Sequence, residues 1–420
     1  MLQPPVIVVP GITATQLDDY YPLETEVVWS AILNKQWERI ALHPDDQRYE
    51  AIEPARVRPR NPFGLVYGDL VEALRHDLSR KADQATPVYG FGYDWRRDCR
   101  LTADELESFI EEVLARTSLI RHYQKALPTE VDLVGHSMGG LVVARYLKKR
   151  QDANLPSRVR RVITLGTPFR GAVDAILKVT TGMGTLTGAD PRDRERETAR
   201  TIPALYQLLP SYRAATNGGV ADNSDVFEVR NWQPSILATL KEFIRLRGAR
   251  VHETALLVAM LKLSRDFIED VNKLDPDRAL SEGKDAWLPI VGIDEKTQVR
   301  FSIKTQPNGQ PRFQFPDMDN DGELTGDGTV PFPGACPDFF PRERLVCVAK
   351  KDLSIWEIRD RALVEAATLH AFLPKVNLVQ KMVIRFLRKD FGGGKYAARP
   401  APGVVKPQWQ QWRWLSQKEH

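Results

Sequence analysis

The sequence predicts an α/β fold: a mainly parallel sheet flanked by helices, with a helical cap inserted between strands. Three observations predict it. Short runs with strand patterns at 6–9, 131–134 and 159–165 alternate with helical stretches, a rhythm typical of parallel strands joined by helices. A Gly-x-Ser-x-Gly turn follows the second run. Residues 172–285 are rich in helical patterns and poor in strands, as expected for a cap or lid.

The turn after the run at 131–134 has the residues of a nucleophile elbow. Gly135, Ser137 and Gly139 occupy the Gly-x-Ser-x-Gly positions, and a helical pattern follows. So tight a turn strains the serine backbone and leaves no room for flanking side chains, and it lifts the hydroxyl clear of the sheet. The Met138 N–H then lies at a helix N-terminus, where an oxyanion would form.

The first strand predicts a second oxyanion donor. Residues 6–9 end in Pro10, Gly11 and Ile12, and a strand that stops there beside the nucleophile directs the Ile12 N–H to the same space. A simple turn after a strand is the alternative.

The stretch between these two strands is predicted to be partly helical. A helix covers 67–76, and Thr102 to Glu105 fits a capping box that opens a helix to about residue 125. Residues 18–62 have the mixed composition of an irregular excursion over the core.

A corner follows the strand predicted at 87–93. Asp94 is placed to pair with Arg96 or Arg97 while Trp95 packs, so we interpret the corner as structural.

Strand patterns return after the insertion. We expect a strand at 287–293, a hairpin at 298–315, a strand at 344–349 and a helix at 374–388. The predicted organisation is a first core part at 1–171, a cap at 172–285, a second core part at 286–395 and a tail at 396–420. The tail carries Trp409, Trp412 and Trp414, which we expect to pack on the fold rather than touch a bilayer interface.

Composition sets the broad class. The chain has 420 residues, 42% hydrophobic content and a net charge of +4, which suits a large globular core and not nucleic-acid binding. No apolar run approaches the roughly 18 residues of a membrane span. Cys99, Cys336 and Cys347 favour a reduced protein, and no secretory signal precedes the first strand, so we expect a cytoplasmic location. Export by a route that needs no signal peptide is the alternative.

A serine nucleophile needs a histidine base, and chain order favours His370. In sheets of this kind the order is serine, acid, histidine, so only His252, His370 and His420 of the seven histidines qualify. His420 is the last residue and His252 lies in the insertion. His370 lies between the last predicted strand and the final helix, where the base belongs.

The acid must lie between the nucleophile and the base, in a loop after a strand. Asp327 is the best candidate, because its flanking glycines let the backbone bring a short carboxylate into a crowded site. Asp294 and Asp321 are weaker competitors, although Asp294 directly follows a strand.

The same loop has the first half of a calcium-loop pattern. Asp317, Asp319 and Asp321 match the EF-hand spacing, but Gly328 stands where that loop needs its bidentate glutamate. An acidic solvated turn is the preferred interpretation, and a structural Ca²⁺ site is the alternative. Calcium would not be the catalyst in either case.

With these residues assembled, the chain resembles the lecithin:cholesterol acyltransferase family, which includes lysosomal phospholipase A2. The shared stretches are Val8–Gly11, Gln16–Leu17, Tyr93–Arg96, Gly135–Gly140, Leu165–Phe169 with Gly171, Tyr206–Pro210 and Gly326–Val330. The family is largely secreted or lysosomal with disulfides, whereas this chain shows no secretory signal and no evident cysteine pair, and residues 213–285 have no recognisable family stretch.

The resemblance implies an α/β-hydrolase fold, and it favours Asp327 over Asp294. The site that it implies is a triad of Ser137, Asp327 and His370 with an oxyanion hole from the backbone of Ile12 and Met138. We therefore expect a serine-dependent lipid acyl-ester hydrolase of phospholipase A type, or an acyltransferase, that contacts a membrane or lipid interface and needs no cofactor. A soluble carboxylesterase or thioesterase on small esters is the alternative, and a noncatalytic binding protein is the third hypothesis.

Overall fold

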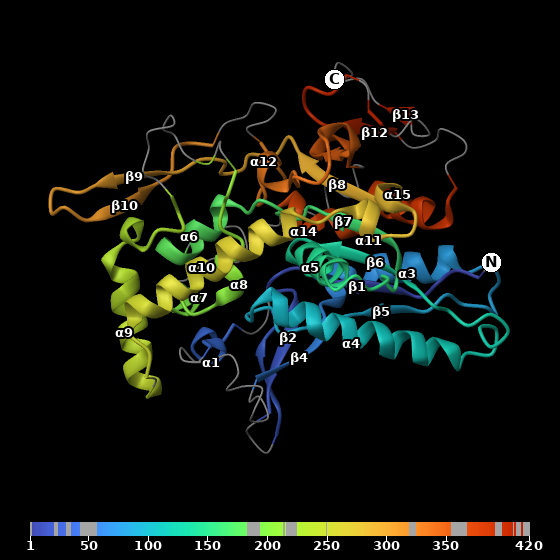
Figure 1. Cartoon of the computed structure of the whole chain (residues 1–420), viewed down its shortest axis with the longest axis horizontal. Coiled ribbons are helices and arrows are strands. Elements are labelled where there is room, and N and C mark those ends of the chain that lie inside the picture. The colour runs from blue at the N-terminus through green and yellow to red at the C-terminus, as the bar shows by residue number, and fades with distance from the viewer. Residues whose placement is uncertain are drawn as a thin grey trace.

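The structure is a computed structural model of the whole chain, shown in Figure 1. It describes residues 2–20, 24–30, 35–42, 57–182, 194–212, 215, 225–248, 250–318, 325–353, 368–390, 397–405, 407–408 and 413–414.

A mainly parallel sheet forms the centre of the fold, which confirms the predicted class. Among the described residues it has eight strands, in the order β13-β12-β11-β8-β7-β6-β1-β5. Neighbours from β5 to β11 run parallel, and β12 is antiparallel to β11. The bounds are β1 Val6–Val9, β5 Val88–Gly90, β6 Val131–His136, β7 Val159–Leu165, β8 Trp287–Ile293, β11 Val346–Ala349, β12 Ala397–Pro400 and β13 Arg413–Trp414.

Helices cover both faces of this sheet. They are α3 (Gly64–Leu78), α4 (Cys99–Ser118), α5 (Met138–Asp152) and α15 (Asn377–Arg388). Val6 and Val8 of β1 pack in the apolar cluster of α3 and α15, whereas Ile7 and Val9 pack in the cluster of α4 and α5. Successive side chains of a strand point to opposite faces, so a strand buried on both faces appears in sequence as an unbroken apolar run.

A second, antiparallel sheet occupies part of the stretch where we expected an irregular excursion. Its strands are β2 (Thr15–Asp19), β3 (Glu26–Trp29) and β4 (Val57–Pro62), in the order β3-β2-β4, and the short helix α1 (Trp37–Ile40) follows β3. The prediction was wrong here because β4, with the sequence VRPRNP, is polar and carries two prolines. Prolines are tolerated because β4 is an edge strand.

Helix α4 begins earlier than the capping-box pattern predicts. Asp98 is the N-cap, and its carboxylate accepts a hydrogen bond from the Arg100 N–H at 2.8 Å. Thr102 is buried within the first turn, and the helix ends at Ser118 rather than near residue 125. The Thr-x-x-Glu spacing was therefore a coincidental match to the motif.

Helices also fill the described chain between β7 and β8. They are α6 (Val173–Thr181), α7 (Glu195–Ala199), α8 (Pro203–Tyr206), α9 (Pro234–Arg247), α10 (Glu253–Asn272) and α11 (Pro276–Ala279). We call this group the insert. Figure 1 shows most of it to one side of the sheet, near the hairpin of β9 (Ser302–Thr305) and β10 (Pro311–Gln314). Gly309 in that hairpin has a φ of 77°, as its predicted turn requires.

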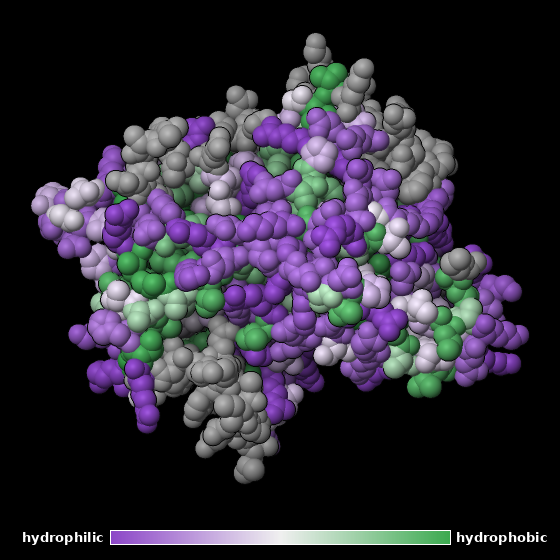
Figure 2. Space-filling view, in the orientation of Figure 1, coloured by the Kyte–Doolittle hydropathy of each residue, from purple (hydrophilic) through white to green (hydrophobic). Residues whose placement is uncertain are grey.

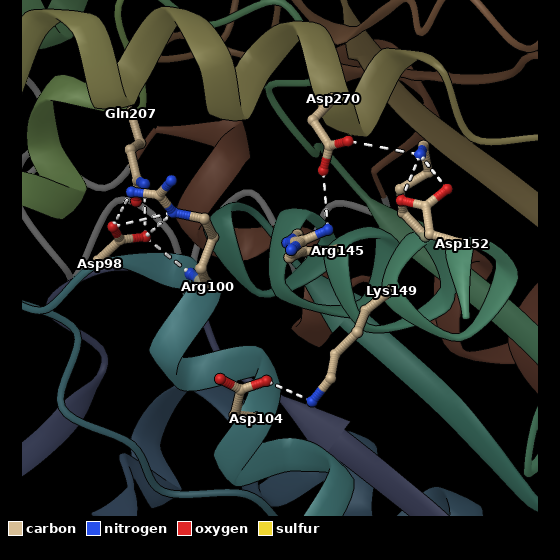
Figure 3. A network of polar contacts seen from close by, with 9 residues as sticks. Asp98, Arg100, Asp104, Arg145, Lys149, Asp152, Gln207 and Asp270 are labelled. Carbon is tan, nitrogen blue, oxygen red and sulfur yellow. Dashed lines mark hydrogen bonds and ion pairs between the residues drawn. The ribbon is translucent and has the colours of Figure 1, made fainter.

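Polar contacts join the insert to α4 and α5, as Figure 3 shows. Gln207, at the end of α8, donates from Nε2 to Asp98 Oδ1 at 2.7 Å. On α5, Arg145 Nη1 pairs with Asp270 Oδ2 of α10 at 2.8 Å, and Lys148 Nζ lies 3.4 Å from the other oxygen of that carboxylate. The insert is thus fixed to the helix that follows the elbow.

The sheet continues beyond the strand expected to be its last. β12 pairs with β11, and β13 pairs with β12, so the tail packs on the sheet edge through its backbone, as we preferred. The residues of β12 read Ala-Ala-Arg-Pro, a run with no apolar alternation to signal a strand. Trp409, Trp412 and His420 lie outside the described residues.

Candidate active site

A strained turn places Ser137 at the carboxyl end of β6. Its φ is 54° and its ψ is −129°, a backbone conformation that L residues rarely adopt. The surrounding glycines are required by space. A Cβ on Gly135 would lie 2.8 Å from the Cα of Gly140, and a Cβ on Gly139 would lie 2.3 Å from the carbonyl oxygen of Val9. The turn therefore has the elbow geometry that the motif predicts.

Three side chains from distant parts of the chain form one hydrogen-bonded line. Ser137 Oγ lies 2.8 Å from His370 Nε2, and His370 Nδ1 lies 2.7 Å from Asp327 Oδ2. All three residues are at most 5% exposed. The structure thus brings together the three residues that the sequence singled out: the serine directly after β6, the base on α14 (Leu369–Phe372) and the acid in the loop before α12 (Phe332–Ala335).

The Asp327 carboxylate fixes the tautomer of His370. Its Oδ1 accepts hydrogen bonds from the Thr329 N–H at 3.1 Å and the Val330 N–H at 2.7 Å, while its Oδ2 faces the imidazole. Because a carboxylate oxygen accepts, Nδ1 carries the proton and Nε2 directs its lone pair toward Ser137. The arrangement can therefore draw the proton from the serine hydroxyl.

Backbone contacts hold the acid loop and the base loop together. The His370 N–H donates to the Asp327 carbonyl oxygen at 2.8 Å. Glu295, just after β8, accepts from the Leu369 N–H at 2.7 Å through Oε2 and exchanges two backbone hydrogen bonds with Gly326. Sequence reasoning missed Glu295, and its place after a predicted strand was the available signal.

Bare backbone lies against the acid and the base. Gly166, after β7, has a φ of 55°, and a Cβ there would lie 2.8 Å from Asp327 Oδ2 and 3.1 Å from His370 Nδ1. A Cβ on Gly292, in β8, would lie 2.4 Å from the Cβ of Asp327. Glycine therefore stands both directly after β7 and within β8, at the two positions where the acid and the imidazole pack against the backbone.

The turn after β1 lies against the nucleophile. β1 and β6 are parallel neighbours, and a Cβ on Gly11 would lie 2.9 Å from the Cβ of Ser137. Among the described residues, the Ile12 N–H has no hydrogen-bond acceptor. Met138 is the first residue of α5, where backbone N–H groups lack helical partners. The turn that carries Ile12 and the first residue of α5 therefore both adjoin the serine.

The corner after β5 supports the same turn. The Tyr93 hydroxyl donates to the Pro10 carbonyl oxygen at 2.8 Å. Asp94 and Arg96 are both buried and pair at 2.6 Å, whereas Arg97 pairs with Glu105. The corner is structural, as interpreted from the sequence.

The other candidates for the acid and the base either make contacts outside the hydrogen-bonded line of Ser137, His370 and Asp327 or lie outside the described residues. Asp294 pairs with Lys351 at 3.8 Å, and its side chain is 41% exposed. His252 is an exposed residue that caps the N-terminus of α10. Asp321 is outside the described residues, as is His420.

Most of the residues of the predicted calcium-loop alternative lie outside the described part of the chain. Asp317 is exposed, and Asp319 and Asp321 lie outside the described residues. Within the described ranges, no group of three or more His, Cys, Asp or Glu side chains is arranged to hold a metal ion.

A second histidine lies beside the base. The His136 ring centroid is 5.1 Å from that of His370. Burial, reinforced by the neighbouring His370, lowers the pKa of His136 to about 3, so this ring is neutral at neutral pH. The sequence pattern treated His136 as the variable position of the serine motif, and no local signal distinguished it.

Comparisons with known proteins agree with this picture. A family model described as Lecithin:cholesterol acyltransferase matches residues 67–288, which is more than half of the 420 residues. Lecithin-cholesterol acyltransferase-like 4 of Arabidopsis thaliana is 26% identical over 196 residues, 40% of this chain and 34% of that protein. Phospholipase A(1) LCAT3 of the same plant is 30% identical over 149 residues, 34% of this chain and 31% of that protein. The matches thus span about a third of the length of these curated relatives.

A solved structure has the same fold. A chain of the Tle4-Tli4 complex matches with a TM-score of 0.55 and 15% identity, covering 79% of this chain and 88% of that chain. At this identity the likeness concerns the fold alone.

Proposed function

The chain belongs to the lecithin:cholesterol acyltransferase family, and from that premise we propose that it is a serine-dependent hydrolase of lipid acyl esters. The observation that carries the proposal is the buried line of Ser137, His370 and Asp327. Its residue types, their order and the fixed tautomer of the histidine suit nucleophilic acyl transfer.

The reaction follows from these positions. Ser137 Oγ attacks the ester carbonyl carbon as its proton passes to His370 Nε2, and the Asp327 carboxylate stabilises the imidazolium. The N–H groups of Ile12 and Met138 hold the oxyanion. The tetrahedral intermediate collapses to an acyl-serine, and the leaving alcohol takes the proton from His370. Water, or a second alcohol, then attacks the acyl-serine by the same steps in reverse.

The outer surface of the insert supports a substrate that lies in a lipid surface. Figure 2 shows apolar residues gathered over the insert. It shows a second, smaller patch of apolar residues near the end of α4. On α9 and α10, Leu246, Val258 and Leu263 are 57%, 45% and 37% exposed. Exposed apolar side chains that gather on one surface are typical of interaction sites. No helix of the described residues is both long and apolar enough to cross a membrane.

The class of lipid is drawn from the relatives. One of the two Arabidopsis thaliana relatives is named a phospholipase A(1). We therefore propose a phospholipid acyl ester as the substrate, with hydrolysis as the principal outcome and transfer to a second alcohol as the alternative outcome.

The decisive experiment uses mixed vesicles of phosphatidylcholine and phosphatidylglycerol, with fatty acid and lysophospholipid measured by mass spectrometry. We expect wild type to release both products, and Ser137→Ala to lower the rate by about 10⁴-fold or more with the melting temperature retained. Ser108→Ala, an exposed serine on α4, is the matched control and should behave as wild type. Unchanged hydrolysis by Ser137→Ala would refute the assignment of the nucleophile.

Two further measurements separate the alternatives. With dihexanoylphosphatidylcholine as substrate, a rise in rate across its critical micelle concentration supports a lipid interface, and a smooth curve supports a soluble esterase. A fluorophosphonate probe should label Ser137. A protein that is folded but not labelled would instead be a noncatalytic binding protein.

A further inference from the structure

A buried hydrogen-bond path runs behind the catalytic line. The Gly11 N–H donates to Tyr67 Oη at 2.9 Å, Tyr67 Oη lies 2.8 Å from His136 Nδ1, and His136 Nε2 lies 2.9 Å from the His370 carbonyl oxygen. Tyr67 is 2% exposed and His136 is 5% exposed. Two side chains therefore connect the turn after β1, the elbow and the base loop.

Only one arrangement of protons satisfies every atom of this path. The His370 carbonyl oxygen is an acceptor, so His136 Nε2 carries a hydrogen. With its pKa lowered to about 3, His136 is neutral, and its Nδ1 is an acceptor for the Tyr67 hydroxyl. The Tyr67 oxygen then accepts the Gly11 N–H, and burial raises the pKa of Tyr67 so that the hydroxyl stays protonated. The path thus runs in one direction, from Gly11 to His370.

Each end of the path is next to a reacting group. Gly11 precedes Ile12, whose N–H is a predicted oxyanion donor, and His136 precedes the nucleophile. The Gly11 N–H is held by Tyr67, so in this turn the next N–H is the one available to an oxyanion. At the other end, the path holds the backbone of the base rather than its ring.

We propose that Tyr67 and His136 are positioning residues, which fix the turn after β1 and the base loop relative to Ser137. The inference rests on the proposed function, because it concerns the rate of that reaction. Neither residue touches the substrate or the reacting atoms in this role. A neutral path also suits the site, because a fixed positive charge beside His370 would oppose the imidazolium that the reaction forms.

The chain offers a matched control at the amino end of β1, opposite to the end that carries Gly11. Tyr123 is also 2% exposed, and its hydroxyl donates to the Gln3 carbonyl oxygen at 2.6 Å, ahead of β1. Tyr123→Phe therefore removes a hydroxyl and its hydrogen bonds, including the one to Gln3, without touching the carboxyl end of the sheet. It measures the cost of losing such a group for structural reasons alone.

The first experiment compares Tyr67→Phe with Tyr123→Phe in the full chain, with p-nitrophenyl butyrate as substrate. Tyr67→Phe leaves the Gly11 N–H without its acceptor, so the oxyanion turn is free to shift. We expect kcat to fall by about 100-fold, because a displacement of about 1 Å costs that much, with KM changed less than about twofold. The rate of fluorophosphonate labelling should fall with kcat, and the melting temperatures of the two variants should match.

The second experiment separates the two halves of the path at His136. An asparagine amide reaches the Nδ1 position, so His136→Asn keeps the contact with Tyr67 and loses the one with His370. A glutamine amide reaches the Nε2 position, so His136→Gln keeps the contact with the His370 carbonyl oxygen and loses the one with Tyr67. We expect Tyr67→Phe to lower kcat about 100-fold in the wild-type background. In the His136→Gln background the Tyr67 hydroxyl has already lost the contact that holds its oxygen in place for the Gly11 N–H, so Tyr67→Phe should lower kcat by less than about 10-fold.

Two results would overturn the inference. One is a Tyr67→Phe variant with wild-type kcat and labelling rate. The other is a loss of kcat that is the same in both backgrounds, because Tyr67 and His136 then act independently. Should Tyr67→Phe fail to fold, the kcat of His136→Asn decides, and a wild-type value there also overturns it. Failure of the proposed function is distinct: wild type itself would then neither hydrolyse the ester nor react with the probe.

Discussion

Strand β6 carries a buried polar side chain near each end, and the two ends are built in opposite ways. At the amino end, Asp132 pairs with Arg160 at 2.5 Å and accepts a hydrogen bond from Gln3 Nε2 at 2.7 Å. At the carboxyl end, the His136 ring is hydrogen-bonded to a tyrosine hydroxyl and a backbone carbonyl group, and the next residue, Ser137, has strained backbone angles. The amino end of the strand therefore carries a salt bridge, whereas the carboxyl end carries a neutral histidine followed by a strained serine.

The pKa shifts show why the two ends differ. Burial raises the pKa of Asp132, although Arg160 opposes that shift, and burial lowers the pKa of His136 to about 3. The interior therefore disfavours charge at both ends. The amino end opposes this cost with a paired cation, which contributes to stability. The carboxyl end keeps His136 neutral beside His370, the group that must gain a positive charge during the reaction. The predictions below test this division, from the largest expected effect to the smallest.

Asp327→Asn should have the largest effect on rate and little effect on stability. The amide oxygen can still accept from the Thr329 and Val330 N–H groups, so an NH₂ group faces His370 Nδ1. Nδ1 must then accept, Nε2 carries the proton, and the base cannot receive the serine proton. We expect kcat to fall about 10⁴-fold, measured with p-nitrophenyl butyrate. A fall below 10-fold would show that Asp327 does not set the tautomer.

Gly166→Ala should lower the rate by about 100-fold, because its Cβ would lie 2.8 Å from Asp327 Oδ2 and would displace the acid or the base. Gly248→Ala is the matched control. Gly248 has a φ of 66° at the end of α9, but a Cβ there meets nothing within 4 Å. Both variants should lose about 1–2 kcal/mol of stability from the left-handed backbone. Equal kcat values for the two variants would contradict the role of close packing.

Asp132→Ala should change stability and leave the reaction intact. It leaves Arg160, whose side chain is 17% exposed, without its partner. We expect a loss of about 2 kcal/mol, below the 3–5 kcal/mol of a fully buried pair because water reaches the guanidinium. Asp104→Ala breaks an exposed pair with Lys149 and should cost less than about 1 kcal/mol. Urea unfolding gives both values. A large loss of kcat in Asp132→Ala would mean that the two ends are coupled.

Acid should destabilise the carboxyl end through His136. The unfolded ring binds a proton below its ordinary pKa of 6.5, whereas the folded ring stays neutral down to about 3. The unfolded state therefore binds more protons, and this stability is fully present above pH 6.5 and is lost as the pH falls toward 3. The slope should approach about 1.4 kcal/mol per pH unit. His136→Gln should remove that part of the slope in urea titrations between pH 4 and pH 7, a range set by the two pKa values. An unchanged slope would show that His136 is not the titrating group.

Prediction from sequence was most successful where a structure is determined by residues that are close together in the sequence. β7 and β8 have the predicted bounds because both are strands of the buried central sheet: all seven residues of β8 are buried and none is charged, and six of the seven residues of β7 are buried despite its two arginines. Chain order and position after the last predicted strand selected His370, whereas the choice of Asp327 over Asp294 also needed the family resemblance, and the structure brings His370 and Asp327 to the serine. Gly135 and Gly139 identified the elbow because no other residue fits there.

The failures occurred where a distant partner decides. Asp98 caps α4 while it also accepts from Gln207, which is 109 positions away in sequence, and no local pattern contains that contact. Tyr67 was predicted only as the first residue of a helix, although its hydroxyl contacts His136, 69 positions away. The polar edge strand β4 and the short β12 are defined by backbone pairing, which side-chain periodicity does not report.

The ion pairs of Asp270 with Arg145 and Lys148 connect the insert to α5 at a distance from the nucleophile. Arg145 is two helical turns beyond the serine, about 12 Å along the axis at 1.5 Å per residue. The insert is therefore held to the part of α5 that lies beyond the nucleophile, towards the carboxyl end of the helix. The elbow itself is formed by glycine backbone and by the turn after β1. A chimera that exchanges the helices between β7 and β8 for those of a relative, and keeps the anchoring carboxylate, should change which lipids are selected and leave the chemistry at Ser137 in place.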